Sequence, residues 1–324
     1  MDIKDNQYLN YMKIEEPLVS VIIPNYNHAR YIDQRIQSIL CQTYKNYEVI
    51  ILDDCSTDNS VEKIEKYKND SRISTIIVNE NNTGVPFKQW HKGMLLAKGS
   101  LIWIAESDDL CEPNFLESLV KAIDKDNNCV LAFCKMIAFT DNGEKWVKTP
   151  DTLSAGIYDS RYFISNFLAL RNSIVNASGV IFKKETALKV DSQYMTFKGV
   201  GDWMFWVELA ECGSIAYIDN GLSHFRQHAN NMTKSNVLSG TNTFDRKQIL
   251  DYIFSKGHID SIKYNEIKER IIINEVFGIP SWKIRRELLN HWEPSFIKKV
   301  NITAKIYLNH IKWLITSYFS RNEI

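Results

Sequence analysis

Apolar, β-branched runs alternate with segments of helical periodicity along the first 140 residues of this chain. The runs typical of strands are residues 19–23, 48–52, 73–78, 101–105 and 130–139. Between them, apolar side chains recur at the spacing of one helix face, as at Ile32, Ile36 and Ile39. Strands that alternate with helices of about three turns imply right-handed crossovers. The sequence therefore predicts an α/β domain of a nucleotide-binding type, with a mostly parallel central sheet flanked by helices.

Polar clusters follow three of these predicted strands, at residues 24–27, 53–54 and 107–109. In open α/β sheets, ligands bind just beyond the carboxyl ends of the strands. The neighbouring acids Asp108 and Asp109 repel each other unless a cation or hydrogen-bond donors satisfy them. A divalent metal bound with a phosphorylated ligand explains this pair, and so does a solvated turn with a helix cap. Three polar strand ends in register are harder to explain as turns alone, so the pattern favours a ligand site.

Two residues of these clusters suit a nucleotide base. The ring of Tyr26 could stack on a base, and the carboxylate of Asp54 could accept a hydrogen bond from a base N–H. Each has a structural alternative, because Tyr26 could be a half-buried loop aromatic and Asp53 could cap the turn at residues 56–58. The sequence leaves these alternatives open.

Composition excludes some classes of protein. The 39 basic and 39 acidic residues cancel, which argues against a dominant nucleic-acid surface. The six cysteines show no Cys-x-x-Cys pair and no zinc spacing, and no apolar signal segment occupies residues 1–16. No run of about 18 apolar residues is present, so we expect no membrane span. We expect reduced thiols in a cytoplasmic protein.

The second half of the chain is less regular. We expect a helix at 162–170, a strand at 177–182, a flexible loop at 199–202 leading into a helix, and short strands at 215–218 and 222–225. Beyond Gly240 the pattern is mostly helical. We therefore divide the chain into a lead-in (1–16), one domain (17–235, with halves at 17–140 and 141–235) and a helical C-terminal extension (236–324).

The order of the motifs resembles a family 2 glycosyltransferase of the GT-A fold, the nucleotide-diphospho-sugar transferase fold. The matching stretches are VSVIIPNYN (19–27), SILCQTY (38–44), DDCSTD (53–58), NTG (82–84), AKG (97–99), ESDD (106–109), GD (201–202) and FRQH (225–228). They cover about residues 18–230. Several motifs in order make the resemblance specific in a way that one Asp-Asp pair is not.

The resemblance implies a donor site. The residues that it assigns to the nucleotide-sugar are Pro24, Tyr26, Asn27, Asp53, Asp54, Asp108 and Arg226. In the family pattern, Pro24 and Tyr26 line the base and ribose, and Asp54 reads a uracil-type ring with support from Asp53. Asp108 then matches the acid that faces the ribose or phosphate.

The resemblance also implies a metal and a base. Asp109 matches the ligand that holds Mn²⁺ or Mg²⁺ against the donor diphosphate, and His228 matches a residue that completes the metal site. Asp202 matches the catalytic base. A divalent cation neutralises the charge on a departing nucleoside diphosphate, and a carboxylate base accelerates attack by a hydroxyl by about 10²–10⁴-fold. One base and one metal suffice for a single displacement, which inverts the anomeric carbon.

The implied activity is transfer of a sugar, most simply from a UDP-sugar, to a hydroxyl of a glycan or lipid-linked acceptor in surface polysaccharide synthesis. The chain departs from the family pattern at Glu106, where an Asp is more frequent, at His91, and at Gly201, where a second acid is common. Trp203 lies beside the expected base and is our candidate for stacking on an acceptor sugar, whereas we expect Trp206 in the core.

Other functions are less consistent with the sequence. A dinucleotide-dependent oxidoreductase needs a Gly-x-Gly-x-x-Gly turn after the first strand, and residues 24–30 contain no glycine. A nucleotidyltransferase needs a glycine-rich basic loop near the amino end, and none appears. A non-catalytic nucleotide or glycan binder that keeps the fold remains the main alternative. The basic amphipathic tail at 302–318 leaves open a peripheral membrane contact, packing on its own domain, or a homodimer.

Overall fold

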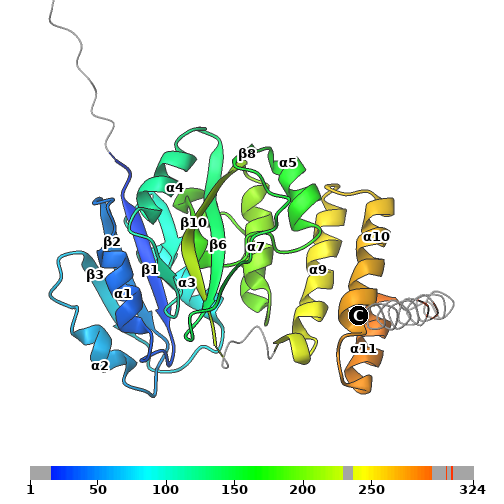
Figure 1. Ribbon diagram of the computed structural model, residues 1–324, viewed down its shortest axis with the longest axis horizontal. Helices are drawn as coiled ribbons and strands as arrows, with labels where there is room; N and C mark the ends of the chain where they lie inside the picture. The colour runs from blue at the N-terminus through cyan, green and yellow to red at the C-terminus, as the bar shows by residue number, and fades with distance from the viewer. Residues whose placement is uncertain (1–15, 229–235, 294–303, 305–307, 309–324) are drawn as a thin grey trace, which may run out of the picture.

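The computed structural model describes residues 16–228 and 236–293, together with residues 304 and 308. Within these residues, ten strands form one sheet in the order β3-β2-β1-β4-β9-β6-β10-β5, with β7 paired to β6 and β8 paired to β10. Helices cover both faces of this sheet (Figure 1). The predicted α/β architecture with a mostly parallel central sheet is confirmed.

The first half of the sheet is parallel throughout. It comprises β1 (Val19–Asn25), β2 (Tyr47–Asp53), β3 (Ile73–Val78) and β4 (Leu101–Ile104). Every side chain of β1, β2 and β4 is buried, which explains their continuous apolar sequences. Asn25 pairs in register with Asp53, and Ala105 N–H donates to the Ile22 carbonyl oxygen at 2.8 Å. The polar ends of these three strands therefore meet at one edge.

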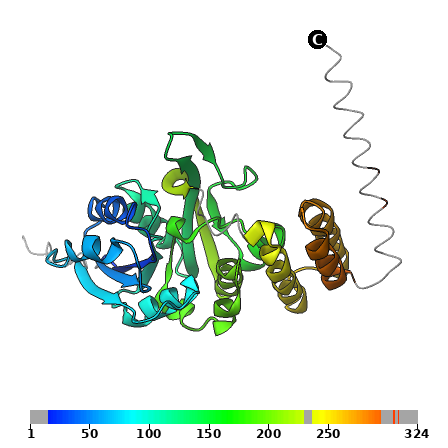
Figure 2. The ribbon, with the colours of Figure 1, turned by 90° about the horizontal axis from the view of Figure 1, so that it is seen from below.

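Helices lie on both faces of the sheet (Figure 2), and each face packs against a hydrophobic core of its own. Alternate residues of β1 enter them, with Val21 and Ile23 on one face and Ile22 on the other. Helices α1 (Ile32–Leu40) and α4 (Phe115–Ile123) cover the first face, and α3 (Pro86–Leu96) and α7 (Gly201–Ala210) cover the second. The short α2 (Ser60–Glu65) follows β2 and packs against β2 and β3.

The second half of the sheet contains antiparallel pairings. Strand β9 (Val180–Lys183) lies antiparallel between β4 and β6 (Cys129–Thr140), and β10 (Ser214–Gln227) lies parallel to β6. Three short strands complete the sheet: β5 (Leu110–Cys111), β7 (Lys145–Val147) and β8 (Gly156–Tyr158).

Some boundaries differ from those that we predicted. The two short strands expected at 215–218 and 222–225 are one strand, β10, with a register shift between Ile218 and Ser223. The strand expected at 177–182 starts only at Val180, after a 3₁₀ turn over Ala177–Gly179. The helix expected at 162–170 is α5 (Ser160–Phe163), which continues as a π-helical turn, η1 (Ile164–Leu168).

After the sheet, the described residues include the helices α9 (Thr241–Ser255), α10 (Ser261–Ile271) and α11 (Trp282–Trp292), with the π-helical turn η4 (Ile272–Val276) after α10. They lie at one end of the sheet, beyond α7, and their apolar residues join the same core as those of α7 (Figure 1). No helix in the described part of the chain is both long and apolar enough to cross a membrane.

The limits of the described residues leave two predictions untested. The predicted division at residue 235 falls next to residues 229–235, which lie outside the described part. The predicted amphipathic tail at 302–318 also lies outside it, except for residues 304 and 308. The domain limits and the role of the tail therefore stay predictions.

Glu208 provides a test of how the core of α7 is built. Its side chain is 6% exposed, and its Oε2 atom has no hydrogen-bond partner among the described residues. Burial, with the charges of Asp191 and Glu211, raises the pKa of Glu208 to about 7. Ionising it in the folded state therefore costs free energy that is absent below its unfolded pKa of about 4.3 and complete above about pH 7.

We predict that Glu208→Gln raises the melting temperature at pH 8 and has little effect at pH 5, as measured by calorimetry across this range. The exposed Glu266→Gln serves as the control and should change neither value. An equal stabilisation by Glu208→Gln at both pH values would contradict this account.

Candidate functional site

Three acidic side chains follow β4: Glu106, Asp108 and Asp109. Burial, followed by the charges of Asp108 and Asp109, raises the pKa of Glu106 to about 8. Burial, followed by the charge of Asp108, raises the pKa of Asp109 to about 7. Trp90 donates its indole N–H to Glu106 Oε1 at 3.1 Å. The end of β4 therefore gathers three carboxyl groups in a part of the protein that solvent reaches poorly, and two of them are harder to ionise than usual.

Asp108 lies in a group with two imidazoles. Ligand atoms of His28, Asp108 and His228 all lie within 4.8 Å of one another. His228 Nε2 lies 3.0 Å from Asp108 Oδ2, and His28 Nδ1 shares a hydrogen bond of 2.7 Å with Ser107 Oγ. Burial alone would raise the pKa of Asp108, but the hydrogen bond and charge of His228 and the charge of His28 hold it below its usual value. Burial lowers the pKa of His28, which favours the neutral imidazole that can bind a cation.

Asp109 is placed differently. It is 1% exposed, and both of its carboxylate oxygens already accept protein hydrogen bonds. Arg226 N–H donates to Oδ1 at 2.9 Å, and Asn176 Nδ2 donates to Oδ2 at 3.0 Å. Although Asp108 and Asp109 are adjacent in sequence, only Asp108 belongs to the group with the histidines.

Arg226 ties this edge of the sheet together. Its Nε donates to the Asp108 carbonyl oxygen at 2.7 Å, its Nη2 donates to Gln34 Oε1 at 2.7 Å, and its Nη1 pairs with Asp141. The guanidinium also lies over the ring of Tyr31, 4.7 Å from the ring centroid. The contacts of the Arg226 side chain therefore link the loop that bears Asp108 to α1 and to the loop after β6.

The ends of β1 and β2 are joined by hydrogen bonds. Asp53 Oδ2 accepts from Asn25 Nδ2 and from Ser56 Oγ, both at 2.7 Å, and Asp53 Oδ1 accepts from Ser56 N–H at 2.8 Å. Asn27 adopts a left-handed backbone with φ of 54°, and its Oδ1 accepts from Thr57 N–H at 2.7 Å. Asp53 thus caps the turn, the structural alternative that the sequence left open. The turn at Asn27 also sets the position of the following residue, His28.

Asp54 anchors the loop after β3. Its carboxylate accepts from Asn79 Nδ2 at 2.8 Å, from Gln89 Nε2 at 2.7 Å, and from the N–H and hydroxyl of Thr83. Asn79, Thr83 and Gln89 also line an open cavity of about 530 Å³. Pro24 lies within buried β1, whereas the side chain of Tyr26 is 45% exposed and free to stack.

Asp202 lies in the first turn of α7. Asn172 Nδ2 donates to its Oδ2 at 2.8 Å, and burial raises its pKa to about 6. The preceding loop, which we expected to be flexible, is held by Asp245 of α9, whose Oδ2 accepts from Gly199 N–H at 2.7 Å. At Gly201 an added Cβ would lie 2.4 Å from the Tyr194 carbonyl oxygen. Close packing therefore explains why no second acid stands before Asp202.

The expected role of Trp203 is wrong. The side chain is only 5% exposed, and its indole N–H donates to the Leu168 carbonyl oxygen at 2.9 Å. It is part of the core, as is the fully buried Trp206, which we predicted to be there. Nearly every residue of α7 is buried, so the helix has no exposed aromatic face on which a sugar could stack.

The structure adds residues that the sequence did not single out. His28 directly follows the motif at 19–27. Its position just after a polar strand end was the only feature of the sequence that could have marked it as a site residue. Asn172 and Asn176 come from a segment without periodicity, so nothing in the sequence marked them as partners of Asp202 and Asp109.

The chain is similar in sequence to a known family and to several known proteins. The profile described as "Glycosyl transferase family 2" matches residues 20–185. The putative teichuronic acid biosynthesis glycosyltransferase TuaG of Bacillus subtilis (strain 168) is 27% identical over 79% of this chain and 98% of its own length. The poly(ribitol-phosphate) beta-N-acetylglucosaminyltransferase TarS of Staphylococcus aureus is 28% identical over 55% of this chain and 32% of its own length.

Solved structures show the same fold at low identity. Crystalline S. aureus TarS aligns with a TM-score of 0.63 and 19% identity, over 85% of this chain and 47% of TarS. A TarS fragment in complex with UDP-GlcNAc aligns at 0.55 and 19%, over 84% and 72%. The mannosyltransferase PcManGT from Pyrobaculum calidifontis, in complex with GDP-Man and Mn²⁺, aligns at 0.56 and 15%, over 91% and 81%. These likenesses establish the GT-A fold.

The shifted pKa of Asp202 can be tested by experiment. Since burial disfavours its charged form, we predict that Asp202 titrates near pH 6 rather than near 4. Asn172→Ala removes a hydrogen bond to the carboxylate and should move the titration to still higher pH. Carboxyl-carbon NMR of protein labelled at Asp measures both values, with Asp202→Asn used to assign the signal. A midpoint below pH 4 in the unaltered protein would contradict this prediction.

Proposed function

Because the chain belongs to glycosyl transferase family 2 and is a glycosyltransferase with the GT-A fold, we propose that it moves a sugar from a UDP-sugar to a hydroxyl group with inversion at the anomeric carbon. The observation that carries this proposal is the group formed by His28, Asp108 and His228. It lies beyond the carboxyl end of β4, where an open α/β sheet binds its ligand.

The donor is proposed as a UDP-sugar because S. aureus TarS has been solved with UDP-GlcNAc and with UDP. In this chain, the exposed ring of Tyr26 would stack on the base. Asp54 would accept from a base N–H only alongside Asn79, Thr83 and Gln89, which already donate to it. We therefore assign Asp53 and Asp54, together with Asn27, mainly to shaping the base site.

The residues present fit a divalent cation. Two imidazole nitrogens and one carboxylate supply three ligands, and such a mixed set suits Mn²⁺ better than Mg²⁺, which prefers oxygen. We propose Asp108, with His28 and His228, as the ligand set, because both oxygens of Asp109 already accept hydrogen bonds. This moves to Asp108 the metal-ligand role that the resemblance implied for Asp109. A bound cation would neutralise charge on the leaving diphosphate.

Asp202 is proposed as the general base. With a pKa of about 6, its carboxylate is mostly ionised at neutral pH and can accept the proton of an acceptor hydroxyl. Asn172 holds one carboxylate oxygen, Oδ2, which fixes the orientation of the other. Arg226 binds no substrate directly in this proposal and instead holds the loop that bears Asp108.

The biological setting is proposed as synthesis of a surface polysaccharide. Support comes from the names of two relatives, which concern teichuronic acid biosynthesis and poly(ribitol-phosphate). We further propose that the protein is cytoplasmic and that its acceptor is lipid-linked. Peripheral contact with a membrane and formation of a homodimer are part of this proposal.

We predict that UDP binds the protein in the presence of Mn²⁺ and that Asp108→Asn weakens Mn²⁺ binding at least about tenfold, because a charged ligand is lost. Isothermal titration calorimetry measures UDP binding, and electron paramagnetic resonance measures free Mn²⁺. The exposed Asp151→Asn is the matched control and should leave both unchanged.

Asp109→Asn distinguishes the two assignments of the metal ligand. If Asp108 is the ligand, Asp109→Asn keeps Mn²⁺ affinity within a few-fold. Loss of Mn²⁺ in Asp109→Asn, with retention in Asp108→Asn, would restore the assignment implied by the sequence. If GDP binds and UDP does not, GDP replaces UDP as the proposed nucleotide.

We predict that Asp202→Asn binds UDP and Mn²⁺ normally but transfers sugar about 10²–10⁴-fold more slowly, since the variant cannot accept a proton. Release of UDP from a panel of UDP-sugars in the presence of acceptor measures the rate. Normal transfer by Asp202→Asn would show that another group is the base. If the unaltered protein binds nucleotide but transfers sugar from no donor of the panel, the non-catalytic alternative is favoured instead.

A further inference from the structure

A second cavity lies between the sheet domain and the C-terminal helices. Its volume is about 360 Å³, and its walls come from the segment after η1, from α9, from α10 and from η4. The residues that matter to the argument are Arg171, Arg246, Ile267, Arg270, Ile271 and Glu275. The cavity is large enough for one sugar unit with a charged substituent.

The lining of this cavity carries an excess of positive charge. Three arginines line it against one acid, Glu275, and that acid already pairs with Arg246. Arg171 and Arg270 are exposed at the cavity and make no ion pair with any described residue. Two planar guanidinium groups that no carboxylate neutralises form a site for a carboxylate or a phosphate.

Arg246 is a fixed part of the wall. Its guanidinium lies 5.1 Å from the centroid of the Trp203 ring, and its Nη2 donates to the Leu170 carbonyl oxygen. Its Nε has no hydrogen-bond partner among the described residues, although it is buried. The arginine at the back of the cavity is therefore held in place by its other contacts.

Residues that line the cavity are connected to the proposed base through two contacts. Leu170 and Arg171 line it, and the next residue, Asn172, donates to Asp202. On the other side, Arg246 stacks on Trp203, the residue that follows Asp202. The segment after η1 thus lines the cavity and, through Asn172, holds the carboxylate that would receive the acceptor proton.

From this placement we propose that the acceptor is an anionic glycan, whose phosphate or carboxylate group binds Arg171 and Arg270 in this cavity while its hydroxyl reaches Asp202. The proposal rests on the function proposed above and specifies its acceptor class. The apolar side chains of Ile267 and Ile271 would pack against the carbon skeleton of the same unit.

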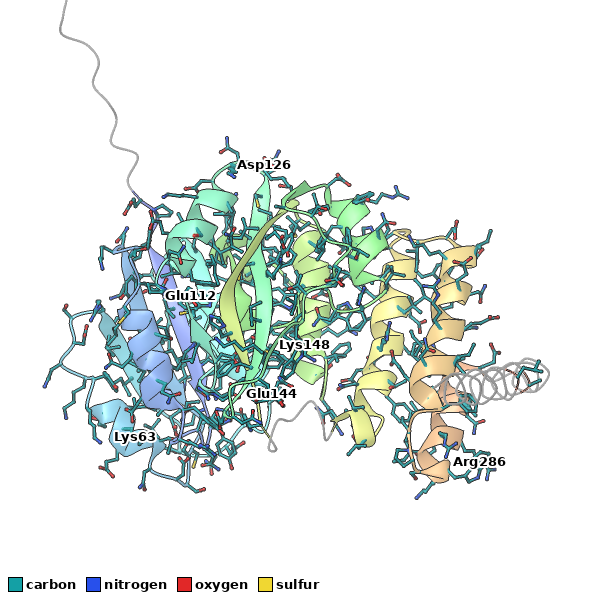
Figure 3. The ribbon with its side chains drawn as sticks, viewed as in Figure 1. Lys63, Glu112, Asp126, Glu144, Lys148 and Arg286 are labelled. Atoms are coloured by element: carbon teal, nitrogen blue, oxygen red, sulfur yellow. The ribbon has the colours of Figure 1, made fainter. Side chains whose placement is uncertain are left out.

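The test uses the full-length protein and three variants. Arg171→Gln, Arg270→Gln and their double variant remove charge from exposed positions, so the fold should persist. Arg286→Gln is the matched control, since Arg286 is an exposed arginine on α11 that does not line the cavity (Figure 3). Ligand-observed NMR titrations measure the binding of ribitol 5-phosphate, glucuronate and uncharged ribitol.

We expect binding of at least one anionic probe, no binding of ribitol, and a loss of about tenfold or more in the double variant but none in Arg286→Gln. Binding of ribitol 5-phosphate alone identifies a phosphate-bearing acceptor, and binding of glucuronate alone identifies a uronate. Equal binding by the double variant, or no binding of either anion, overturns the proposal. UDP binding, measured in the same samples, reports separately on the donor site, so the two proposals can fail independently.

Discussion

The clustering of three carboxyl groups after β4 is the constraint on which the rest of the site depends. Glu106, Asp108 and Asp109 lie within four residues of chain, and the pKa values of Glu106 and Asp109 are raised. One compensating charge is Arg35 of α1, which is fully buried over the Trp103 ring at 4.8 Å and lowers both of those pKa values. Its guanidinium has no hydrogen-bond partner in the described part of the chain, so it acts through its charge.

The site is also closed by long-range pairing. Asp108 and His228 are 120 residues apart in sequence, and β10 brings them together by pairing with β6 and β5. Arg226 then fixes the loop through contacts with Gln34 and with the Asp108 backbone. Local folding of the first half alone cannot bring His28, Asp108 and His228 together. The geometry of this group and the stability of the second half of the sheet are therefore coupled.

Strands could be predicted from the sequence where burial on both faces produces a continuous apolar run. Strands β1, β2 and β4 are buried on both faces, so each reads as one apolar run. The antiparallel insertion of β9 was not predictable, because strand order depends on contacts distant in sequence. The different surroundings of Asp108 and Asp109 could not be predicted either, because neighbouring residues in a turn point in different directions. A single histidine such as His28 has no periodicity to mark it.

The shared core of α7 and α9 to α11 bears on how this protein is made. As the chain leaves the ribosome, β1 to β4 and their helices are completed before α7 and the helices that follow it. Helix α7, which carries Asp202, buries its apolar surface partly against helices that end at Trp292. Until those helices emerge, α7 exposes that surface. Exposed apolar surface on an incomplete chain favours aggregation, so the interval between synthesis of α7 and synthesis of α11 is the one in which this protein most needs protection.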